Sequence, residues 1–396
     1  MVVVTASYNR ENLEKAGIGK AKIVYVNPHI KLTLLEKIIS FLRAGGTKGW
    51  TLQMLLNYPN IIKFERGAWR LLAEEIKAGK FDLVHRVSPM SPTLPSYLAR
   101  VCPIPTVVGP LNGGLKWPNG FLGKMFQERE WLHLLRSAYR FLPFNSSTYK
   151  KATCVLPSFQ HTIDDLPKGI DGKSINFPEV GINPEMFSYK ERPEQDKVTI
   201  VTIGRLVPYK QPDVLVEAIA RSPLLQQQKT MVVGEGPEAG KLKDLIRTHN
   251  LEGCVELTGQ ISHKEVSQLM NTADIFAFPS IRELGAGAVI EAMASGMACV
   301  VPDYGAPGTL IGEGRGLSLP FKDRESLIEE YVGALERLVK NPEERRSFGA
   351  AAHEHAKAYY SWENKAKKTR EIYDWILGGM TGVKPDFWQG SEKSEN

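Results

Sequence analysis

The segment VTIVTIGRLVPYKQPDVLVEAIAR, residues 198–221, decides the class of fold. Residues 199–206 are apolar and rich in β-branched side chains, a composition typical of a buried strand. Residues 212–221 carry apolar side chains at helical spacing and begin with proline, which is favoured at the first position of a helix. A strand followed directly by a helix predicts one unit of a parallel sheet covered by helices.

The same alternation continues along the second half of the chain. Apolar runs predict further strands at 230–234, 255–258, 274–279 and 298–302. Helical spacing predicts helices at 237–249, 263–272 and 287–294, and Ser262 with Glu265 forms a capping box before the second of them. This series predicts an α/β, doubly wound parallel sheet, in which ligands bind outside the carboxyl ends of the strands.

The first half follows a similar but less regular pattern. Strands are expected at 2–5, 23–27, 81–87, 106–109 and 152–157, a mainly helical stretch at 30–80 with a break at Gly45-Gly46, and a long helix at 121–142. Prolines and glycines interrupt the pattern at 176–193, which places a domain boundary there. The predicted organisation is a domain at 1–178, a second at 179–360, a final helix within 361–378 and a frayed polar tail at 379–396.

Composition places the chain among soluble globular proteins. It has 396 residues, enough for two domains, with 42% hydrophobic and 24% charged residues. No apolar run is long enough to span a membrane and the start carries no basic leader, so we expect neither a membrane helix nor a signal peptide. Four widely spaced cysteines in or beside apolar runs indicate small core residues of a reduced, cytoplasmic protein rather than a zinc site or disulfides.

Charge is distributed unevenly between the two halves. Residues 1–178 contain 24 lysines and arginines against 12 acids, whereas residues 179–396 contain 26 against 32. A basic first half favours an anionic partner (lipid headgroups, an acidic acceptor or nucleic acid), although it equally fits a surface that only maintains solubility. The helix expected at 131–144 mixes aromatic and basic residues, which fits either an anionic membrane surface, and hence a peripheral membrane location, or a core helix with solvated arginines.

Two cations follow the first strand of the second half. Arg205 lies at its end and Lys210 five residues later. A departing diphosphate gains negative charge, which fixed cations can stabilise without a metal; arginine offers a planar fork and lysine a point charge. The alternative is that both are solvated side chains at the end of a strand.

Two carboxylates, Glu283 and Glu291, bracket the segment that opens the helix at 287–294. Glu291 lies among small and apolar residues, and two adjacent ribose hydroxyls would satisfy its carboxylate. Glu283 precedes a segment in which Gly285, Ala286 and Gly287 allow close approach to a ligand, with free N–H groups at the helix start. With the two cations they predict a nucleotide-sugar ligand; the alternative is a pair of structural ion pairs, one of them with Arg282.

Loops at other strand ends supply weaker candidates. The backbone of Gly234 and Gly236 can approach a ligand, and the main chain of Gln260 and Ile261 can pair with a nucleobase edge. In the first half the loop of Asn112, Gly113 and Gly114 follows a strand and can form an N–H cradle, and His85 ends another strand, where it fits a structural or substrate-positioning role better than that of a base. A plain turn explains either loop as well.

As a set, these motifs resemble those of the family 4 glycosyltransferases, most strongly at 198–307. The resemblance rests on Gly204-Arg205 with Lys210, Gly234-Glu235-Gly236-Pro237, Glu256-Leu257-Thr258-Gly259, Ala273-Asp274-Ile275-Phe276, and Glu283 to Glu291 followed by Ala292-Met293-Ala294-Ser295-Gly296. It implies the GT-B fold, two Rossmann-like doubly wound domains facing across a cleft, with the acceptor side at 1–178, the nucleotide-sugar side at 179–360, and a closing helix that crosses back to the first domain.

The resemblance also implies an activity. A hexose-type sugar would move from a nucleoside diphosphate to a glycan, lipid-linked or small-molecule acceptor, with retention of configuration, without a metal or other cofactor, in polysaccharide or glycolipid synthesis. Arg205 and Lys210 would hold the diphosphate, Glu283 the donor sugar and Glu291 the ribose. Nucleic acid would not be a partner.

Three departures from the family pattern bear on that expectation. Leu-Gly-Ala-Gly follows Glu283 where Gly-Phe-Gly-Leu is usual. No histidine lies on the strand that contains Val107 and Val108, so that family role is not transferred. The chain also opens at what resembles the second strand of the family, so the first strand and its Gly-rich loop are expected to be missing. A non-catalytic nucleotide-sugar binder and a GT-B epimerase or phosphorylase are therefore kept as alternatives.

Overall fold

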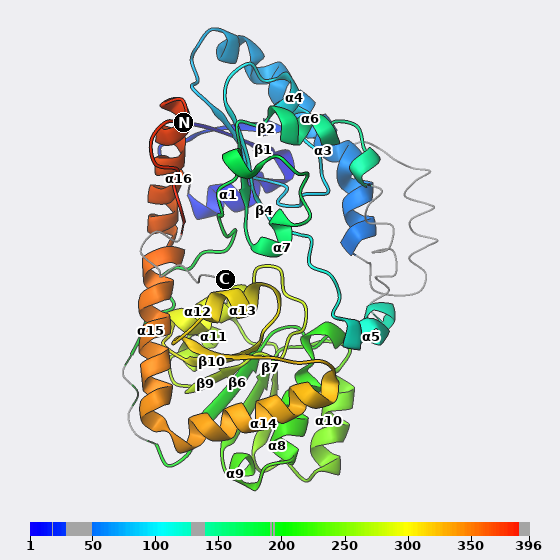
Figure 1. Ribbon diagram of the computed structural model, residues 1–396, viewed down its shortest axis with the longest axis vertical. Coiled ribbons are helices and arrows are strands. Elements are labelled where there is room, and N and C mark those ends of the chain that lie inside the picture. Colours follow the sequence, from blue (N-terminus) through cyan, green and yellow to red (C-terminus); the bar gives the residue numbers. More distant parts are fainter. Residues whose placement is uncertain (18, 29–49, 128–138, 191, 193–194, 388–396) are drawn as a thin grey trace.

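The computed structural model describes residues 1–17, 19–28, 50–127, 139–190, 192 and 195–387. They form two lobes that lie one above the other in Figure 1, with the first half of the chain mainly in the upper lobe and the second half mainly in the lower. Each lobe is built from parallel strands and helices, as the sequence predicts.

The C-terminal lobe contains a parallel six-stranded sheet in the order β11-β10-β9-β6-β7-β8. The strands are β6 (Thr199–Ile203), β7 (Lys229–Val233), β8 (Val255–Gly259), β9 (Ile275–Ala277), β10 (Ala298–Pro302) and β11 (Gly316–Leu319). The chain winds from β6 out to β8, and then from β9 out to β11 on the other side. The direction of winding reverses between β6 and β9, and ligands of such sheets bind at that reversal.

Helices cover both faces of this sheet (Figure 1). They are α8 (Pro212–Ala220), α9 (Pro223–Gln226), α10 (Ala239–Thr248), α11 (His263–Met270), α12 (Gly287–Ala294), α13 (Gly305–Ile311), α14 (Arg324–Lys340) and α15 (Pro342–Tyr360). The predicted strands and helices between 199 and 302 are confirmed, with differences of a few residues at their ends, and the capping box of Ser262 and Glu265 is present.

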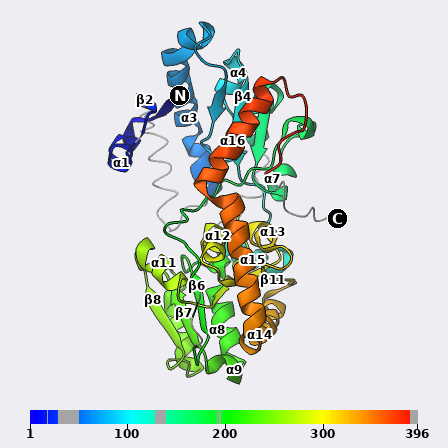
Figure 2. The ribbon, with the colours of Figure 1, turned by 90° about the vertical axis from the view of Figure 1, so that its left-hand side faces the viewer.

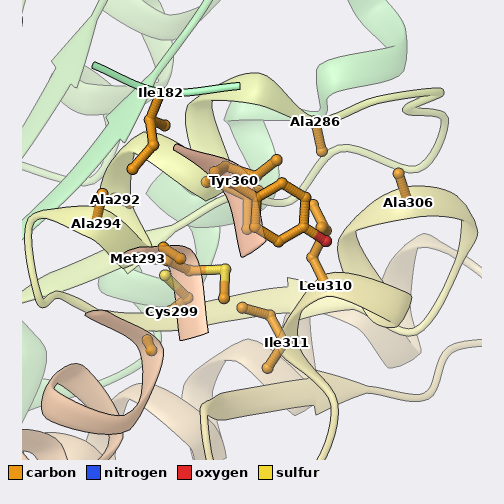
Figure 3. Packing of buried hydrophobic residues seen from close by; sticks show 14 of the residues in the cluster. Ile182, Ala286, Ala292, Met293, Ala294, Cys299, Ala306, Leu310, Ile311 and Tyr360 are labelled. Atoms are coloured by element: carbon orange, nitrogen blue, oxygen red, sulfur yellow. The ribbon is translucent and has the colours of Figure 1, made fainter. Parts of the chain in front are cut away.

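Alternate residues of the central strand enter separate cores on the two faces. Ile200 packs with the face covered by α8, α10 and α14, and Val201 with the face covered by α12, α13 and α15. This period of two is the reason that the strand reads as uniformly apolar. Figure 3 shows the second core, where Tyr360 at the end of α15 lies among Met293, Cys299 and Leu310. The buried side chains of α12 are therefore part of this packed core.

The N-terminal lobe has the five predicted strands, but they form two separate parallel sheets. β1 (Val2–Ala6) pairs with β2 (Lys22–Val26), and β4 (Thr106–Leu111) lies between β3 (Val84–Arg86) and β5 (Cys154–Pro157). Its helices are α1 (Arg10–Ala16), α3 (Trp50–Lys77), α4 (Leu98–Val101), α6 (Asn145–Lys151) and α7 (Gln160–Ile163). α5 (Leu122–Gln127) belongs to the first half of the chain but packs on the C-terminal lobe (Figure 1). The break at Gly45-Gly46 lies outside the described residues.

The long helix expected at 121–142 is confirmed at its described start and wrong at its described end. The chain is helical only in α5 before the described residues stop at 127, and residues 139–141 form a short 3-10 turn. Phe144 then adopts a left-handed conformation with φ of 70°, directly after a proline, so the helix expected at 131–144 cannot extend to its predicted end. Residues 131–138 lie outside the described residues, and the membrane-facing interpretation of that segment stays a prediction.

The expectation of a frayed tail is wrong as far as residue 387. Phe387 is buried, with its ring centroid 5.3 Å from that of Phe177 and 5.8 Å from that of Tyr360. The segment is polar in composition, but a single aromatic side chain anchors it in the core. Residues 388–396 lie outside the described part of the chain.

α16 (Trp362–Leu377) and the segment that leads into the C-terminal lobe both cross between the lobes. This helix continues from the end of α15 and runs along the N-terminal lobe, as the side view in Figure 2 shows. The segment that leads into the C-terminal lobe is tied to this crossing, because the amide of Ile182 donates to the carbonyl oxygen of Tyr360 at 2.8 Å. The domain boundaries themselves stay predictions.

Candidate active site

The loops after β6 and β9 flank the reversal point of the sheet and carry the predicted cations and the first carboxylate. The loop after β6 is pressed against the loop after β7, because a β-carbon on Gly234 would overlap the carbonyl oxygen of Gly204. Gly234 has φ of 134°, so glycine is required there for conformation as well as space. The neighbouring loops therefore form one continuous rim.

Lys210 and Glu283 meet across the reversal point. The Lys210 ammonium donates to Glu283 Oε1 at 2.6 Å, and the Ser280 hydroxyl donates to the same oxygen at 2.8 Å. The ammonium lies 4.7 Å from the ring centroid of Phe278. The side chains of the pair are only 17% and 15% exposed, so the charge is partly desolvated and fixed in direction. Such a fixed cation is suited to stabilise a developing anion.

Arg205 lies on the same loop with an exposed side chain. Its Nη2 donates to the hydroxyl of Tyr209 at 3.1 Å, and Tyr209 is the neighbour of Lys210. The two predicted cations are thus connected through one tyrosine. A guanidinium carries several N–H donors, so donors other than the one bonded to Tyr209 can bind an anionic ligand.

Glu291 lies on α12, and its partner is a histidine on the neighbouring helix. His263 Nε2 is 3.1 Å from Glu291 Oε1, and the Glu291 side chain is 25% exposed. Burial raises the pKa of Glu291 above its usual value, and the hydrogen bond with His263 opposes that shift. His263 begins α11, directly after the loop of Gln260 and Ile261, so this carboxylate faces the predicted nucleobase loop. Ile261 is itself partly buried against the core, while Gln260 is exposed.

The N-terminal lobe touches the rim at Gly285. Asn112 Nδ2 donates to Oε1 of Glu179, and a β-carbon on Gly285 would overlap that oxygen and lie 3.4 Å from Asn112 Nδ2. Asn112 Oδ1 is also 3.3 Å from His161 Nε2. A predicted acceptor-side residue and a predicted donor-side residue are thereby brought together.

The predicted N–H cradle at Gly113 and Gly114 is already occupied. The amide of Gly113 donates to the Thr162 hydroxyl at 3.2 Å, and that hydroxyl donates back to the Gly113 carbonyl at 2.9 Å. Gly114 packs so closely on α7 that a β-carbon would overlap the carbonyl oxygen of His161. This glycine pair positions Asn112; its role toward a ligand stays a prediction.

Both ring nitrogens of His85 are engaged within the protein. Nε2 donates to the Gly109 carbonyl at 2.7 Å, which leaves Nδ1 to accept from the Tyr373 hydroxyl at 2.6 Å. Burial lowers the pKa of His85, so the ring stays neutral. Because Tyr373 belongs to α16, the histidine fastens the crossing helix to β3, which favours the structural side of the prediction.

The predicted residues Gly285, Ala286 and Gly287 lie where the chain enters α12. Ala286 is buried and has a left-handed conformation with φ of 49°, which turns the chain into the helix that Gly287 begins. In the loop after β7, a β-carbon on Gly236 would overlap the carbonyl oxygen of Leu206, just as one on Gly234 would overlap that of Gly204. The described geometry thus places the backbone of these residues along the rim.

Several residues of the site were missed from the sequence. Trp117, Phe121 and Met125, in a segment of the first half, are buried in the core of the C-terminal lobe, and α5 packs beside the short turn that carries Lys210 (Figure 1). The Arg282 guanidinium lies 5.1 Å from the centre of the Trp117 ring. From the sequence, Glu179 is only one residue of a predicted domain boundary.

Three further features of the described part of the chain concern other kinds of site. Its residues contain no group of three or more histidine, cysteine or acidic side chains placed to hold a metal ion, and none of its helices is both long and apolar enough to cross a bilayer. A basic hollow of about 600 Å³ lies at the opposite edge of the large sheet, where β6, β7 and β8 begin. Ligands of parallel sheets bind at the other edge, so we do not assign the site to this hollow.

Known proteins resemble part of the chain in sequence. Residues 185–355 match the family model described as glycosyl transferases group 1. The chain is 31% identical over 245 residues to a phosphatidylinositol N-acetylglucosaminyltransferase subunit of Arabidopsis thaliana, covering 60% of this chain and 52% of that protein. It is 30% identical over 198 residues to D-inositol 3-phosphate glycosyltransferase of Kineococcus radiotolerans, covering 45% of this chain and 44% of that protein. The chain spans about half the length of these curated relatives.

Solved structures extend the likeness to both lobes. HepE of Anabaena in complex with UDP has a TM-score of 0.61 to this chain at 15% identity, covering 94% of this chain and 91% of that one. The fold is therefore GT-B, as the sequence predicts. The narrower assignment to family 4 stays a prediction.

Proposed function

We propose that the protein is a retaining, metal-independent glycosyltransferase that takes a hexose-type sugar from a nucleoside diphosphate. The observation that carries the proposal is the Lys210–Glu283 pair at the reversal point of the sheet, with Arg205 on the same loop. A half-buried cation and a second, exposed one, next to a helix start, are suited to a diphosphate. Asn112 of the other lobe and Glu179 of the segment that joins the lobes approach the same loop, where an acceptor would enter.

In this reaction the protein assists departure of the diphosphate. Lys210 and Arg205 neutralise the charge that develops on the phosphate oxygens as the sugar–oxygen bond breaks. Glu283, held by Lys210 and Ser280, presents its second oxygen to a hydroxyl of the sugar. The acceptor attacks from the face that the diphosphate leaves, and a phosphate oxygen takes its proton, so configuration is retained.

The identity of the substrates is proposed as a class. HepE was solved with UDP, and the two curated relatives are named for inositol-containing acceptors. A uridine, guanosine or adenosine diphosphate sugar is the donor class, and a glycan, a lipid-linked or a small-molecule acceptor receives the sugar, in polysaccharide or glycolipid synthesis. A basic N-terminal half would hold the protein at the inner, anionic surface of a membrane.

Donor binding and hydrolysis measurements separate this proposal from its alternatives. In a thermal-shift screen with UDP-, GDP- and ADP-sugars in the presence of EDTA, we expect the sugars of one nucleoside diphosphate to raise the melting temperature of the protein. Slow release of free sugar from that donor supports transfer chemistry. Binding without release or transfer over a broad acceptor panel would favour a non-catalytic binder, and interconversion of the free sugar's epimers would favour an epimerase.

Replacing Glu291 by alanine is expected to weaken nucleotide binding by roughly ten- to a hundredfold. The reason is that ribose hydroxyls lose a charged acceptor, a contact worth about 1.5–3 kcal/mol. Titration calorimetry with the free nucleoside diphosphate measures the change. Glu330→Ala, an exposed acid on α14, is the control; equal affinity of the Glu291 variant and wild type would remove this residue from the site.

Replacing Arg205 by alanine is expected to lower turnover by roughly 10²-fold, the scale for loss of one charge-stabilising donor. Its side chain is exposed and, within the described part of the chain, hydrogen-bonds only with Tyr209, so the fold should be unaffected. Initial rates at saturating donor give the comparison. The matched control is Arg247→Ala, an exposed arginine on α10 at the far end of the lobe. Full activity of the Arg205 variant would refute its role.

A further inference from the structure

Glu179 lies in the segment that joins the lobes, and its two carboxylate oxygens have different surroundings. Oε1 accepts a hydrogen bond from Asn112 Nδ2. Oε2 is buried and has no hydrogen-bond partner among the described residues. Native proteins leave few buried acceptors unpaired, and an ionised one is especially unfavourable. Oε2 of Glu179 therefore needs a hydrogen-bond donor that the described residues do not supply.

The position of this carboxylate points to a ligand rather than to the interior of one lobe. Oε1 of Glu179, the oxygen that Asn112 holds, lies so close to Gly285 that any side chain there would overlap it. Gly285 is two residues after Glu283, in the loop that leads into α12. The carboxylate thus borders the place that the proposed function gives to the transferred sugar.

Lys365, a cation near Glu179, already has other partners. Lys365 of α16 is buried, its ammonium donates to the carbonyl oxygen of Pro178, and it lies 4.4 Å from the centre of the Phe177 ring. Burial lowers the pKa of Lys365 to about 8, and the charge of Glu179 acts in the opposite direction. The lysine therefore contributes a favourable field to Glu179 but no hydrogen bond to Oε2.

We propose that Glu179 is a specificity-determining residue that accepts a hydrogen bond from a hydroxyl of the transferred sugar through Oε2. Asn112, fixed by His161, orients the carboxylate by holding the other oxygen. A site that contains a charged acceptor rejects a sugar that lacks the matching hydroxyl, because the acceptor is then left buried and unpaired. This inference rests on the proposed glycosyltransferase function.

The test compares the affinity of a nucleotide-sugar with that of its nucleoside diphosphate. The probes are UDP with UDP-glucose, GDP with GDP-mannose and ADP with ADP-glucose, titrated calorimetrically into the full chain. For the pair that wild type binds, Glu179→Gln is expected to weaken the nucleotide-sugar about tenfold or more and the diphosphate less than twofold, because only the sugar loses a charge-assisted hydrogen bond. Glu185→Gln, an exposed acid in the same segment, is the control and should change neither affinity.

Other outcomes overturn the inference. If Glu179→Gln weakens binding of the nucleotide-sugar and of the diphosphate equally, Glu179 is a purely structural residue. If neither affinity changes, even with a raised KM for an acceptor, Glu179 does not contact the transferred sugar. If the variant fails to fold, singly deoxygenated analogues of the sugar are titrated into wild type: one of them should bind about tenfold more weakly, and equal binding of all would contradict the inference. Failure of wild type to bind any diphosphate in the panel refutes the proposed function itself, and this inference with it.

Discussion

Replacing Lys210 by alanine is expected to lower the turnover of sugar transfer by roughly 10²–10³-fold, the range found when one preorganised charge-stabilising group is removed. The ammonium is fixed by Glu283 and lies over Phe278, so its charge is already oriented before the diphosphate departs. Its loss also leaves the Glu283 carboxylate, which is 15% exposed, with the Ser280 hydroxyl as its one remaining hydrogen-bond donor among the described side chains. The diphosphate and the sugar would therefore both be held less well.

Steady-state rates with the donor identified by the screen measure this effect. A melting curve of each variant separates loss of chemistry from loss of fold, because an uncompensated partly buried acid also destabilises the protein. Lys229→Ala is the matched control: this lysine lies at the opposite edge of the same sheet, 51% exposed beside Glu256. Turnover of the Lys210 variant within a few-fold of wild type would show that the diphosphate binds elsewhere.

Replacing Gly285 by alanine is expected to reduce activity by about 10²-fold, the scale for a displacement of about 1 Å between reacting groups. The new β-carbon would overlap the Glu179 carboxylate, which is hydrogen-bonded to Asn112. Either the carboxylate moves or the lobes separate, and in both cases the two sides of the site lose their register. Overpacking of this kind costs about 1–3 kcal/mol of stability.

Gly333 on α14 provides a matched control away from the site. A β-carbon there would meet nothing within 4 Å among the described residues. Gly333→Ala should therefore keep both activity and melting temperature close to wild type, since alanine is also the better helix former. Equal activity of the two alanine variants would contradict the close contact between the lobes at Gly285.

The sequence predicted the C-terminal lobe well because its elements are determined locally. The strand that begins at Thr199 alternates its residues between two cores, and α12 begins and ends at the predicted residues. Lys210 and Glu283 could be assigned to one rim in advance because parallel strands end at one edge of the sheet. Their direct contact follows from the order of β6 and β9, which alternation alone does not reveal.

The remaining features depend on partners that are distant in the sequence. Trp117 reads as one aromatic residue in a loop, and only the core of the other lobe explains its burial. Phe387 lies in a polar tail and is buried by Phe177, more than two hundred positions earlier. His85 is a candidate for the site by its place at a strand end, but Tyr373, far along the chain, occupies one of its nitrogens. Local composition carries no signal for such contacts.

The most direct test of the central claim is a crystal structure of the protein with the nucleoside diphosphate that stabilises it. We expect the diphosphate between Arg205 and Lys210, with the ribose hydroxyls at Glu291 in place of His263. A diphosphate bound in the basic hollow at the other edge of the sheet, among Lys197, Lys229, Lys243 and Arg247, would contradict the account.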